Sequence, residues 1–165
     1  MSVAASMFWI GLGLLAWVYA GYPVLLWLLG LLGVRRPIAA EPIEPRVTLI
    51  VSAYNERQVI GAKLENCRRL DYPADRFEVI VVSDASDDGT DDVVLAAGPP
   101  ARLLRMEARG GKTVGLNAAL RAAQGDIIVF SDANAMYERD ALRMLVRNFA
   151  DPRVGAVTGE SRYEI

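Results

Sequence analysis

The chain has 165 residues, a length that suits one domain, with a single cysteine and no histidine. Without histidine, this chain excludes Ser-His and Cys-His nucleophilic catalysis and histidine-ligated zinc, and a lone cysteine excludes an intramolecular disulfide. The net charge of −2 gives no reason to expect nucleic acid as a partner. Any general base is therefore a carboxylate or lies elsewhere.

Residues 1–34 contain no Asp, Glu, Lys or Arg, and from residue 7 onward they are almost wholly apolar, glycine or aromatic. A helix over residues 7–34 would reach roughly 40 Å, which exceeds the ~30 Å hydrocarbon core of a bilayer. The stretch is too long, and its start too poor in basic residues, for a cleaved signal peptide. We therefore predict that residues 1–34 form a transmembrane anchor helix in the cell membrane, in which Pro23 is tolerated.

Arg35 and Arg36 follow this apolar segment directly. The positive-inside rule places the rest of the chain in the cytoplasm and the amino terminus outside. Residues 35–46 contain Pro37, Pro42 and Pro45, which predict a stiff, extended linker.

From residue 47 onward, apolar runs typical of buried strands alternate with helical patterns. Strands are predicted over residues 47–53, 77–84, 101–106 and 126–132, with a fifth beginning at residue 154. Asn55 is expected to cap the first helix, with Gln58 completing a capping box. A last helix is expected over residues 138–151. This alternation predicts an α/β fold over residues 47–165, with a largely parallel sheet and helices on both faces.

Polar side chains follow four of the predicted strands, where ligands bind in parallel sheets. They are Tyr54, Asn55, Glu56, Asp84, Lys112, Asp132 and Asn134. A divalent cation takes oxygen ligands and reaches a nucleotide through one or two carboxylates and phosphate. Asp132 is suited to this role, and Asn134 offers a weaker, neutral oxygen. The structural alternative is that Asp132 and Asn134 only close a turn.

Lys112 and Asp84 each have a functional and a structural interpretation, and the structural one is weaker for Asp84, which directly ends an apolar strand. Glycines before Lys112 would present free N–H groups to a phosphate, or Lys112 is simply a solvated residue at a helix start. Asp84 could bind a ribose or base edge, and the acid-rich segment after it could instead cap a helix.

Two nucleotide-binding motifs are matched only in part. The sequence GLGLLA, residues 11–16, fits a dinucleotide fingerprint but lies in the apolar segment without a preceding strand. The sequence GGKT, residues 110–113, matches the end of a P-loop, although Met106 stands where the first glycine is required. A P-loop-like NTPase is one alternative function, and a non-catalytic membrane-tethered partner subunit is another.

Four segments in order carry a family resemblance: VSAYNE, VIVVSDASDDGT, GGKTVGLNAAL and DIIVFSDAN. With this order and spacing, residues 47–160 resemble the amino-terminal half of an inverting family 2 glycosyltransferase with the GT-A fold. The membrane helix before the domain is similar to that of members that make or modify surface polysaccharides.

The resemblance implies a nucleotide-sugar site formed by Ala53, Tyr54, Glu56, Asp84, Lys112 and Asp132. The first three would line the base and ribose pocket, Asp84 would bind the base or ribose, and Lys112 would lie near the nucleotide-binding edge. Asp132 matches the first acid of a D-x-D element, which helps to hold a divalent metal, Mg or Mn, and the diphosphate. Asn134 stands where the family often has a second acid, so its share in metal binding is tentative.

The resemblance also implies a function for the parent protein. It would transfer a sugar from a nucleotide-diphosphate sugar to an acceptor hydroxyl with inversion, in polysaccharide or glycolipid synthesis. The family's general base lies in its later half, so it is expected beyond Ile165. The chain is accordingly expected to be a fragment that binds nucleotide but turns over little or nothing.

Overall fold

The computed structural model describes residues 2–32 and 37–160, and the chain divides into two compact units, Met1–Ile38 and Ala39–Ile165. The first unit is helical, and the second is an α/β domain. Each is described by itself.

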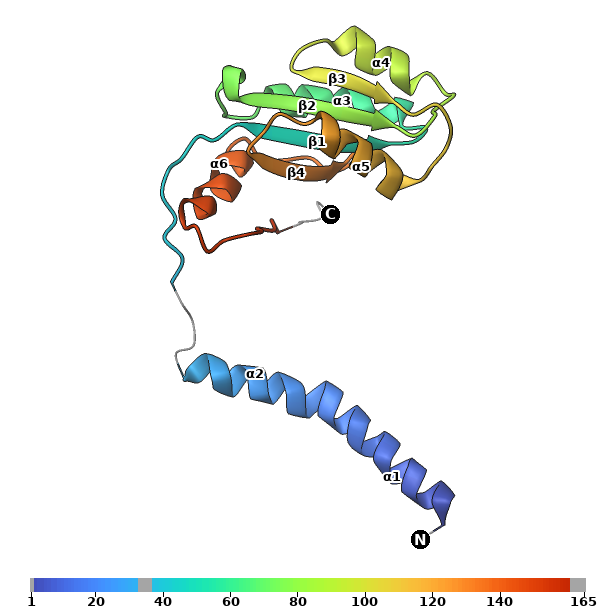
Figure 1. Cartoon of the computed structure of the whole chain (residues 1–165), viewed down its shortest axis with the longest axis vertical. Helices are drawn as coiled ribbons and strands as arrows, with labels where there is room; N and C mark the ends of the chain where they lie inside the picture. Colours follow the sequence, from blue (N-terminus) through green and yellow to red (C-terminus); the bar gives the residue numbers. More distant parts are fainter. Residues whose placement is uncertain (1, 33–36, 161–165) are drawn as a thin grey trace. The chain divides into compact units, whose positions relative to one another are not determined.

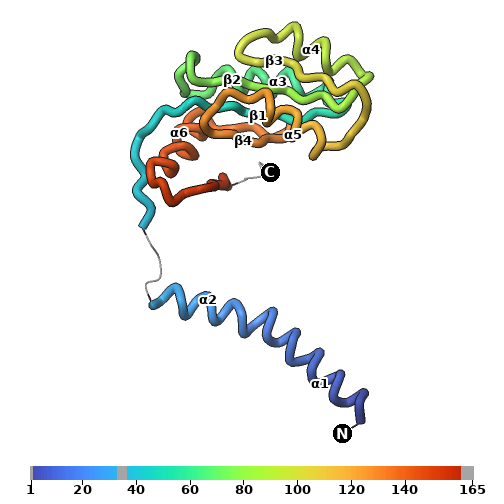
Figure 2. Tube along the Cα trace, in the orientation of Figure 1, coloured from blue at the N-terminus to red at the C-terminus, as the bar shows by residue number. Residues whose placement is uncertain are grey.

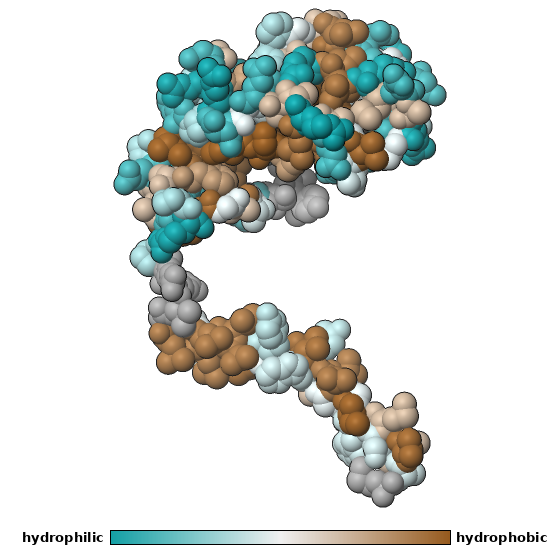
Figure 3. All heavy atoms as spheres, in the orientation of Figure 1, coloured by the Kyte–Doolittle hydropathy of each residue, from teal (hydrophilic) through white to brown (hydrophobic). Residues whose placement is uncertain are grey.

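The amino-terminal unit contains one helix, Val3–Leu31, that is long and apolar enough to cross a membrane. It comprises α1 (Val3–Ala16), a π-helical turn (Trp17–Gly21) and α2 (Tyr22–Leu31). Most of the face seen in Figure 3 is apolar, and no side chain of α1 or α2 is buried. Such a helix suits a lipid environment. Residues 33–36, including the two arginines used to predict orientation, lie outside the described residues.

The π-helical turn has a local cause in Pro23. A proline ring inside an α-helix clashes with the carbonyl four residues earlier, which here belongs to Tyr19. Tyr19 lies in the wider π turn, and the backbone N–H of Tyr22 donates to the carbonyl of Trp17. The helix therefore continues past the proline. The glycines of residues 11–16 lie in α1 without a preceding strand, so the fingerprint match there is accidental.

The second unit contains a four-stranded parallel sheet with the order β3-β2-β1-β4 (Figure 1). Its strands are β1 (Val47–Ala53), β2 (Phe77–Ser83), β3 (Ala101–Arg105) and β4 (Ile127–Asp132). The two central strands, β1 and β2, are almost entirely buried, as their unbroken apolar runs predict. The predicted parallel sheet is confirmed.

Helices cover both faces of the sheet because alternate residues of each strand face opposite sides. Leu49 and Val51 of β1 pack in a cluster with α3 (Arg57–Arg68) and α4 (Thr90–Ala97). Ile50 packs in a separate cluster with α5 (Lys112–Ala122) on the other face. The short helix α6 (Ala141–Val146) packs beside Val47.

The strand order reverses after β3, because the chain crosses through α5 to place β4 beside β1 (Figure 2). In open sheets of this order, ligands bind beyond the carboxyl ends of the strands, where the strand order reverses. Here that place lies at the ends of β1 and β4.

Two local predictions are wrong. Residues 154–160 form no strand, and two glycines, Gly155 and Gly159, weaken any strand tendency in this segment. Asn55 does not cap α3, whose N-cap is Glu56 without a side-chain bond. Asn55 instead adopts a left-handed backbone with φ of 55° and bonds a different loop.

The last predicted helix is shorter than expected, since α6 ends at Val146 and a 3₁₀ turn (Arg147–Ala150) follows.

Residues 37–46 have no regular secondary structure, and from Ala39 onward they lie against the α/β domain. The backbone N–H of Glu41 donates to the carbonyl of Arg147, and the Tyr72 hydroxyl donates to the carbonyl of Pro45 over 2.6 Å. This part of the linker is therefore attached to the surface of the domain.

Candidate functional site

The strand register places three loop starts at the same edge of the sheet. Ala53 at the end of β1 lies opposite Ser83 at the end of β2, and Ser52 lies opposite Asp132 at the end of β4. The polar residues that follow these strands therefore emerge side by side, as their position after parallel strands predicts.

The loop between β3 and α5, residues 106–111, contacts the residues that follow β1 and β2, and the first residue of α5 contacts the end of β4; we call residues 106–111 the β3–α5 loop. Its first contact is with Asp84, which is only 8% exposed. The Asp84 carboxylate accepts hydrogen bonds from the backbone N–H groups of Gly110 (2.7 Å) and Gly111 (2.9 Å). Gly111 has a φ of 84°, a conformation that glycine adopts without steric cost. Asp84 therefore holds this loop in place, and its oxygens retain further acceptor capacity.

The second contact of the β3–α5 loop is a stacking pair. The guanidinium carbon of Arg109 lies 4.0 Å from the centroid of the Tyr54 ring, within the range of a cation–π interaction. Sequence reasoning identified Tyr54 and missed Arg109. A basic residue directly before two glycines and Lys112 was a usable signal.

The third contact links the start of α5 to the end of β4. The Lys112 ammonium lies 2.5 Å from Oδ1 of Asp132, and both side chains are more than half exposed. An exposed pair of this kind contributes little to stability. Because both side chains are exposed, both groups are accessible to a ligand. The structure thus brings Tyr54, Asp84, Lys112 and Asp132 together at one edge, around the β3–α5 loop and the start of α5.

The Asp132–Asn134 segment presents two oxygen donors on the solvent side. Both residues are exposed, while Ala133 between them is 2% exposed and packs in the core. A carboxylate and an amide oxygen suit a hard cation such as Mg²⁺ or Mn²⁺ that takes its remaining ligands from phosphate. Among residues 2–32 and 37–160, no group of three or more His, Cys, Asp or Glu side chains forms a closed metal site.

Lys63 and Asn66 of α3 also contact the segment after β4, and sequence reasoning missed both. Lys63 is fully buried, and this burial lowers its pKa, against the opposing effect of the nearby Cys67 and Asp132 charges. The signal was present in the sequence, since Lys63 shares a helix face with the apolar Ile60 and Cys67.

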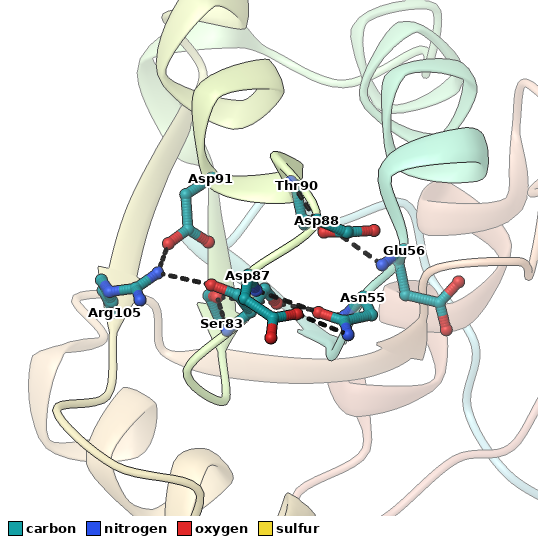
Figure 4. A network of polar contacts seen from close by, with 9 residues as sticks. Asn55, Glu56, Ser83, Asp87, Asp88, Thr90, Asp91 and Arg105 are labelled. Atoms are coloured by element: carbon teal, nitrogen blue, oxygen red, sulfur yellow. Dashed lines mark hydrogen bonds and ion pairs between the residues drawn. The ribbon is translucent and has the colours of Figure 1, made fainter.

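A network of polar contacts joins the loops after β1 and β2 (Figure 4). Asn55 and Asp87 bond each other twice, through Nδ2 to Oδ1 (2.9 Å) and through the Asp87 backbone N–H to Oδ1 of Asn55 (3.1 Å). The Asp88 carboxylate accepts from the Arg57 backbone N–H, and the Thr90 hydroxyl oxygen accepts from that of Glu56. The start of α3 is therefore capped by Asp88 of the loop after β2 and by Thr90, the first residue of α4, and not by Asn55.

Glu56 contributes its backbone to this network, while its carboxylate points away from it (Figure 4). At the other end of the network, Arg105 pairs with the largely buried carboxylate of Asp91 and donates to the carbonyl of Ser86 over 3.0 Å. Ala53 accepts from the backbone N–H of Asp84 and is buried. The predicted binding roles of Ala53 and Glu56 stay predictions.

Comparison with known proteins shows which sequences this chain is similar to. Residues 48–165 match glycosyl transferase family 2. Beta-monoglucosyldiacylglycerol synthase of Synechocystis sp. is 42% identical over 118 residues, which cover 68% of this chain and 25% of the synthase. Poly-beta-1,6-N-acetyl-D-glucosamine synthase of Staphylococcus aureus is 29% identical over 119 residues, covering 70% and 28%. The chain spans about a quarter of the length of these curated relatives.

Solved structures give the same result. The mannosyltransferase PcManGT from Pyrobaculum calidifontis, in complex with GDP-Man and Mn²⁺, is similar with a TM-score of 0.78 and 39% identity. The match covers 90% of this chain and 46% of that one. S. aureus TarS 1–349 in complex with UDP-GlcNAc has a TM-score of 0.57 and 28% identity, covering 60% and 29%. The family match covers most of this chain, and the predicted resemblance is confirmed: the chain belongs to glycosyl transferase family 2.

Proposed function

We propose that this chain is the donor-binding part of a membrane-anchored glycosyltransferase that uses a nucleotide-diphosphate sugar. The observation that carries the proposal is that the β3–α5 loop and the first residue of α5 make three contacts with the ends of the other strands. Arg109 stacks on Tyr54, Gly110 and Gly111 donate to Asp84, and Lys112 directly after the loop pairs with Asp132. A nucleoside diphosphate requires an aromatic or polar site for its base and a cationic site for its phosphates, and this edge offers both.

We assign the base and ribose to the end of β1 and β2, where Ala53, Tyr54, Glu56 and Asp84 lie. The diphosphate is assigned to the side of Lys112 and Asp132. Exposed cationic groups there would attract the phosphates.

Asp132 and Asn134 would hold the divalent metal, Mg or Mn, together with the diphosphate. When bound, the metal supplies positive charge that offsets the negative charge on the departing diphosphate. The Mn²⁺ in the complex of the mannosyltransferase PcManGT supports the presence of a divalent metal.

The proposed reaction is a displacement with inversion. The acceptor oxygen forms a bond to the anomeric carbon while the bond from that carbon to the diphosphate oxygen breaks. The hydroxyl proton passes to a carboxylate base, and the nucleoside diphosphate leaves. None of the described carboxylates is assigned the role of base.

The acceptor is proposed to be a glycolipid or a polysaccharide at the membrane surface. Two named relatives support this class, a monoglucosyldiacylglycerol synthase and a poly-N-acetylglucosamine synthase. The apolar helix Val3–Leu31 would anchor the domain at the cytoplasmic side of the membrane, the orientation that Arg35 and Arg36 indicate.

Calorimetric titration of the full chain in detergent micelles tests the proposal, with UDP-glucose and GDP-mannose as probes. We expect one of them to bind, more tightly with Mn²⁺ than with EDTA, and we expect Asp132→Ala to remove the gain from Mn²⁺. Absence of binding by either probe, with or without Mn²⁺, would contradict the proposal.

The same preparation separates the transferase from the two alternatives. ATP hydrolysis that is lost in Lys112→Ala, without binding of nucleotide sugars, would indicate a P-loop-like NTPase. Binding of a partner protein that survives Asp132→Ala, without metal-dependent nucleotide binding, would indicate a non-catalytic subunit. Membership of glycosyl transferase family 2 favours the transferase over both.

A further inference from the structure

Lys63 lies in an unusual place for a lysine. Its side chain is fully buried in α3. The Nζ atom donates a 2.5 Å hydrogen bond to the carbonyl of Ala135 and lies 4.1 Å from the centroid of the Tyr137 ring. Both contacts are with the segment that follows β4.

Asn66, three residues further along α3, contacts the same segment. Its Nδ2 donates to the carbonyl of Tyr137 over 2.8 Å, and its Oδ1 accepts from the backbone N–H of Tyr137 over 2.9 Å. The side chain thus pairs with both backbone groups of one residue.

The segment held in this way contains the two proposed metal ligands. We call residues 132–137 the ligand turn. The backbone N–H of Ala135 donates to the carbonyl of Asp132 over 3.3 Å, and the side chain of Ala133 is buried in the core. Asp132 and Asn134 themselves are exposed. The ligand turn is therefore anchored on its protein side, through Ala133, Ala135 and Tyr137, while its oxygen donors face solvent.

Burying an amine costs desolvation energy that an apolar side chain at the same position would not incur. In the core of α3, an apolar residue would satisfy packing alone. What Lys63 adds is a directed hydrogen bond to one carbonyl of the ligand turn, and Asn66 adds two more. Groups that orient metal ligands without touching the metal typically change metal affinity about 10–100-fold when they are removed.

We propose that Lys63 and Asn66 are positioning residues that fix the ligand turn so that Asp132 and Asn134 meet a divalent cation bound to a nucleoside diphosphate. This inference rests on the proposed function, because it assumes that Asp132 and Asn134 face the cation and the diphosphate.

The test compares the full wild-type chain with Lys63→Met and Asn66→Ala, all in detergent micelles. Methionine has a similar length and lacks the donor, and Asn66 is only partly buried, so Asn66→Ala keeps the test available if Lys63→Met does not fold. Ile80→Val is the matched control, since it shortens a fully buried side chain in the cluster on the other face of the sheet.

Two readouts are used, neither of which depends on turnover. Electron paramagnetic resonance follows Mn²⁺ binding in the presence of UDP and, in a second series, of GDP. Amide hydrogen exchange follows the ligand turn without metal. We expect both variants to bind Mn²⁺ about 10–100-fold more weakly and to exchange faster in residues 132–137. Metal-free nucleotide affinity should be unchanged, and Ile80→Val should match the wild type in all of these measurements.

The possible failures are distinguishable. Wild-type Mn²⁺ affinity in both variants would overturn the positioning role and leave the proposed function standing, even if exchange in the ligand turn is faster. If the wild-type chain does not bind Mn²⁺ with either nucleotide, the proposed function and the inference that rests on it are both overturned.

Discussion

The two edges of the sheet differ in what their polar groups do. At the edge where the strands begin, a hollow of about 490 Å³ is lined by Glu44, Pro45, Arg46, Asp75, Arg76, Gln124 and Asp126. Several of these groups bond to the backbone, as Asp126 does to the N–H of Arg46 and Arg76 to the carbonyl of Glu44. At the edge where the strands end, Tyr54, Lys112, Asp132 and Asn134 are exposed.

This difference shows that the size of a hollow does not by itself identify a binding site. Polar groups at the starting edge hold the beginnings of the strands and the linker together. Those at the carboxyl edge are gathered around one loop and keep free bonding capacity. Ligands of parallel sheets bind at the carboxyl edge, and the following changes test whether the two edges separate stability from binding.

The largest effect is expected for Gly125→Ala at the starting edge. A Cβ atom at Gly125 would lie 2.4 Å from the backbone nitrogen of Thr48, so the starts of β1 and β4 would have to move apart. We expect a loss of about 3 kcal/mol in the free energy of unfolding, measured by urea denaturation. Nucleotide affinity of the folded protein should be unchanged.

Gly111→Ala at the carboxyl edge is the matched change. Nothing lies within 4 Å of its added Cβ, but its φ of 84° is unfavourable for alanine. The expected loss is smaller, about 1 kcal/mol, and nucleotide affinity should fall because relief of the unfavourable φ would turn the backbone N–H of residue 111 away from Asp84. Equal stability losses for the two variants would contradict the comparison.

Asp84→Ala is expected to have an intermediate effect on stability. It leaves two backbone N–H groups of the β3–α5 loop without their acceptor, which costs about 2 kcal/mol. Because the loop also carries Arg109, nucleotide binding should weaken together with stability. The control is Asp126→Ala, whose carboxylate accepts from the Arg46 backbone at the starting edge. A similar loss of affinity in Asp126→Ala would show that the two edges are not functionally distinct.

The smallest expected effect concerns the pH dependence of stability through Glu78, at the starting edge. Burial alone would raise its pKa, but bonds from Thr48, the Gln124 backbone and Arg102 outweigh burial and lower it below the usual 4.5. A lowered folded-state pKa stabilises the fold above pH 4.5, and this contribution is lost as the pH falls through the lowered value.

We therefore expect the stability difference between wild type and Glu78→Gln to be largest near neutral pH and to shrink below pH 4.5. Urea denaturation from pH 3 to pH 7 measures it. A difference that does not vary with pH would show that these bonds do not depend on the charge of Glu78. Nucleotide affinity at neutral pH should be the same in both proteins.

The strands and the location of the candidate site were predictable from the sequence. The apolar runs that form β1 and β2 are buried on both faces, and their shortness, their β-branched residues and their alternation with helical patterns indicate strands of a parallel sheet. Once the strands are parallel, the residues that follow them must share an edge. The position of Tyr54, Asp84 and Asp132 along one edge therefore follows from local patterns alone, as does the apolar helix Val3–Leu31.

Which side chains meet at that edge was decided by tertiary structure. Asparagine often caps helices, but Asp88 and Thr90 supply the caps of α3. Asn55 pairs with Asp87 instead. Arg109 meets Tyr54, and Lys63 meets Ala135, across 55 and 72 residues of sequence. Periodicity and capping rules describe neighbours within a few residues, whereas these contacts depend on the order of strands and the path of loops.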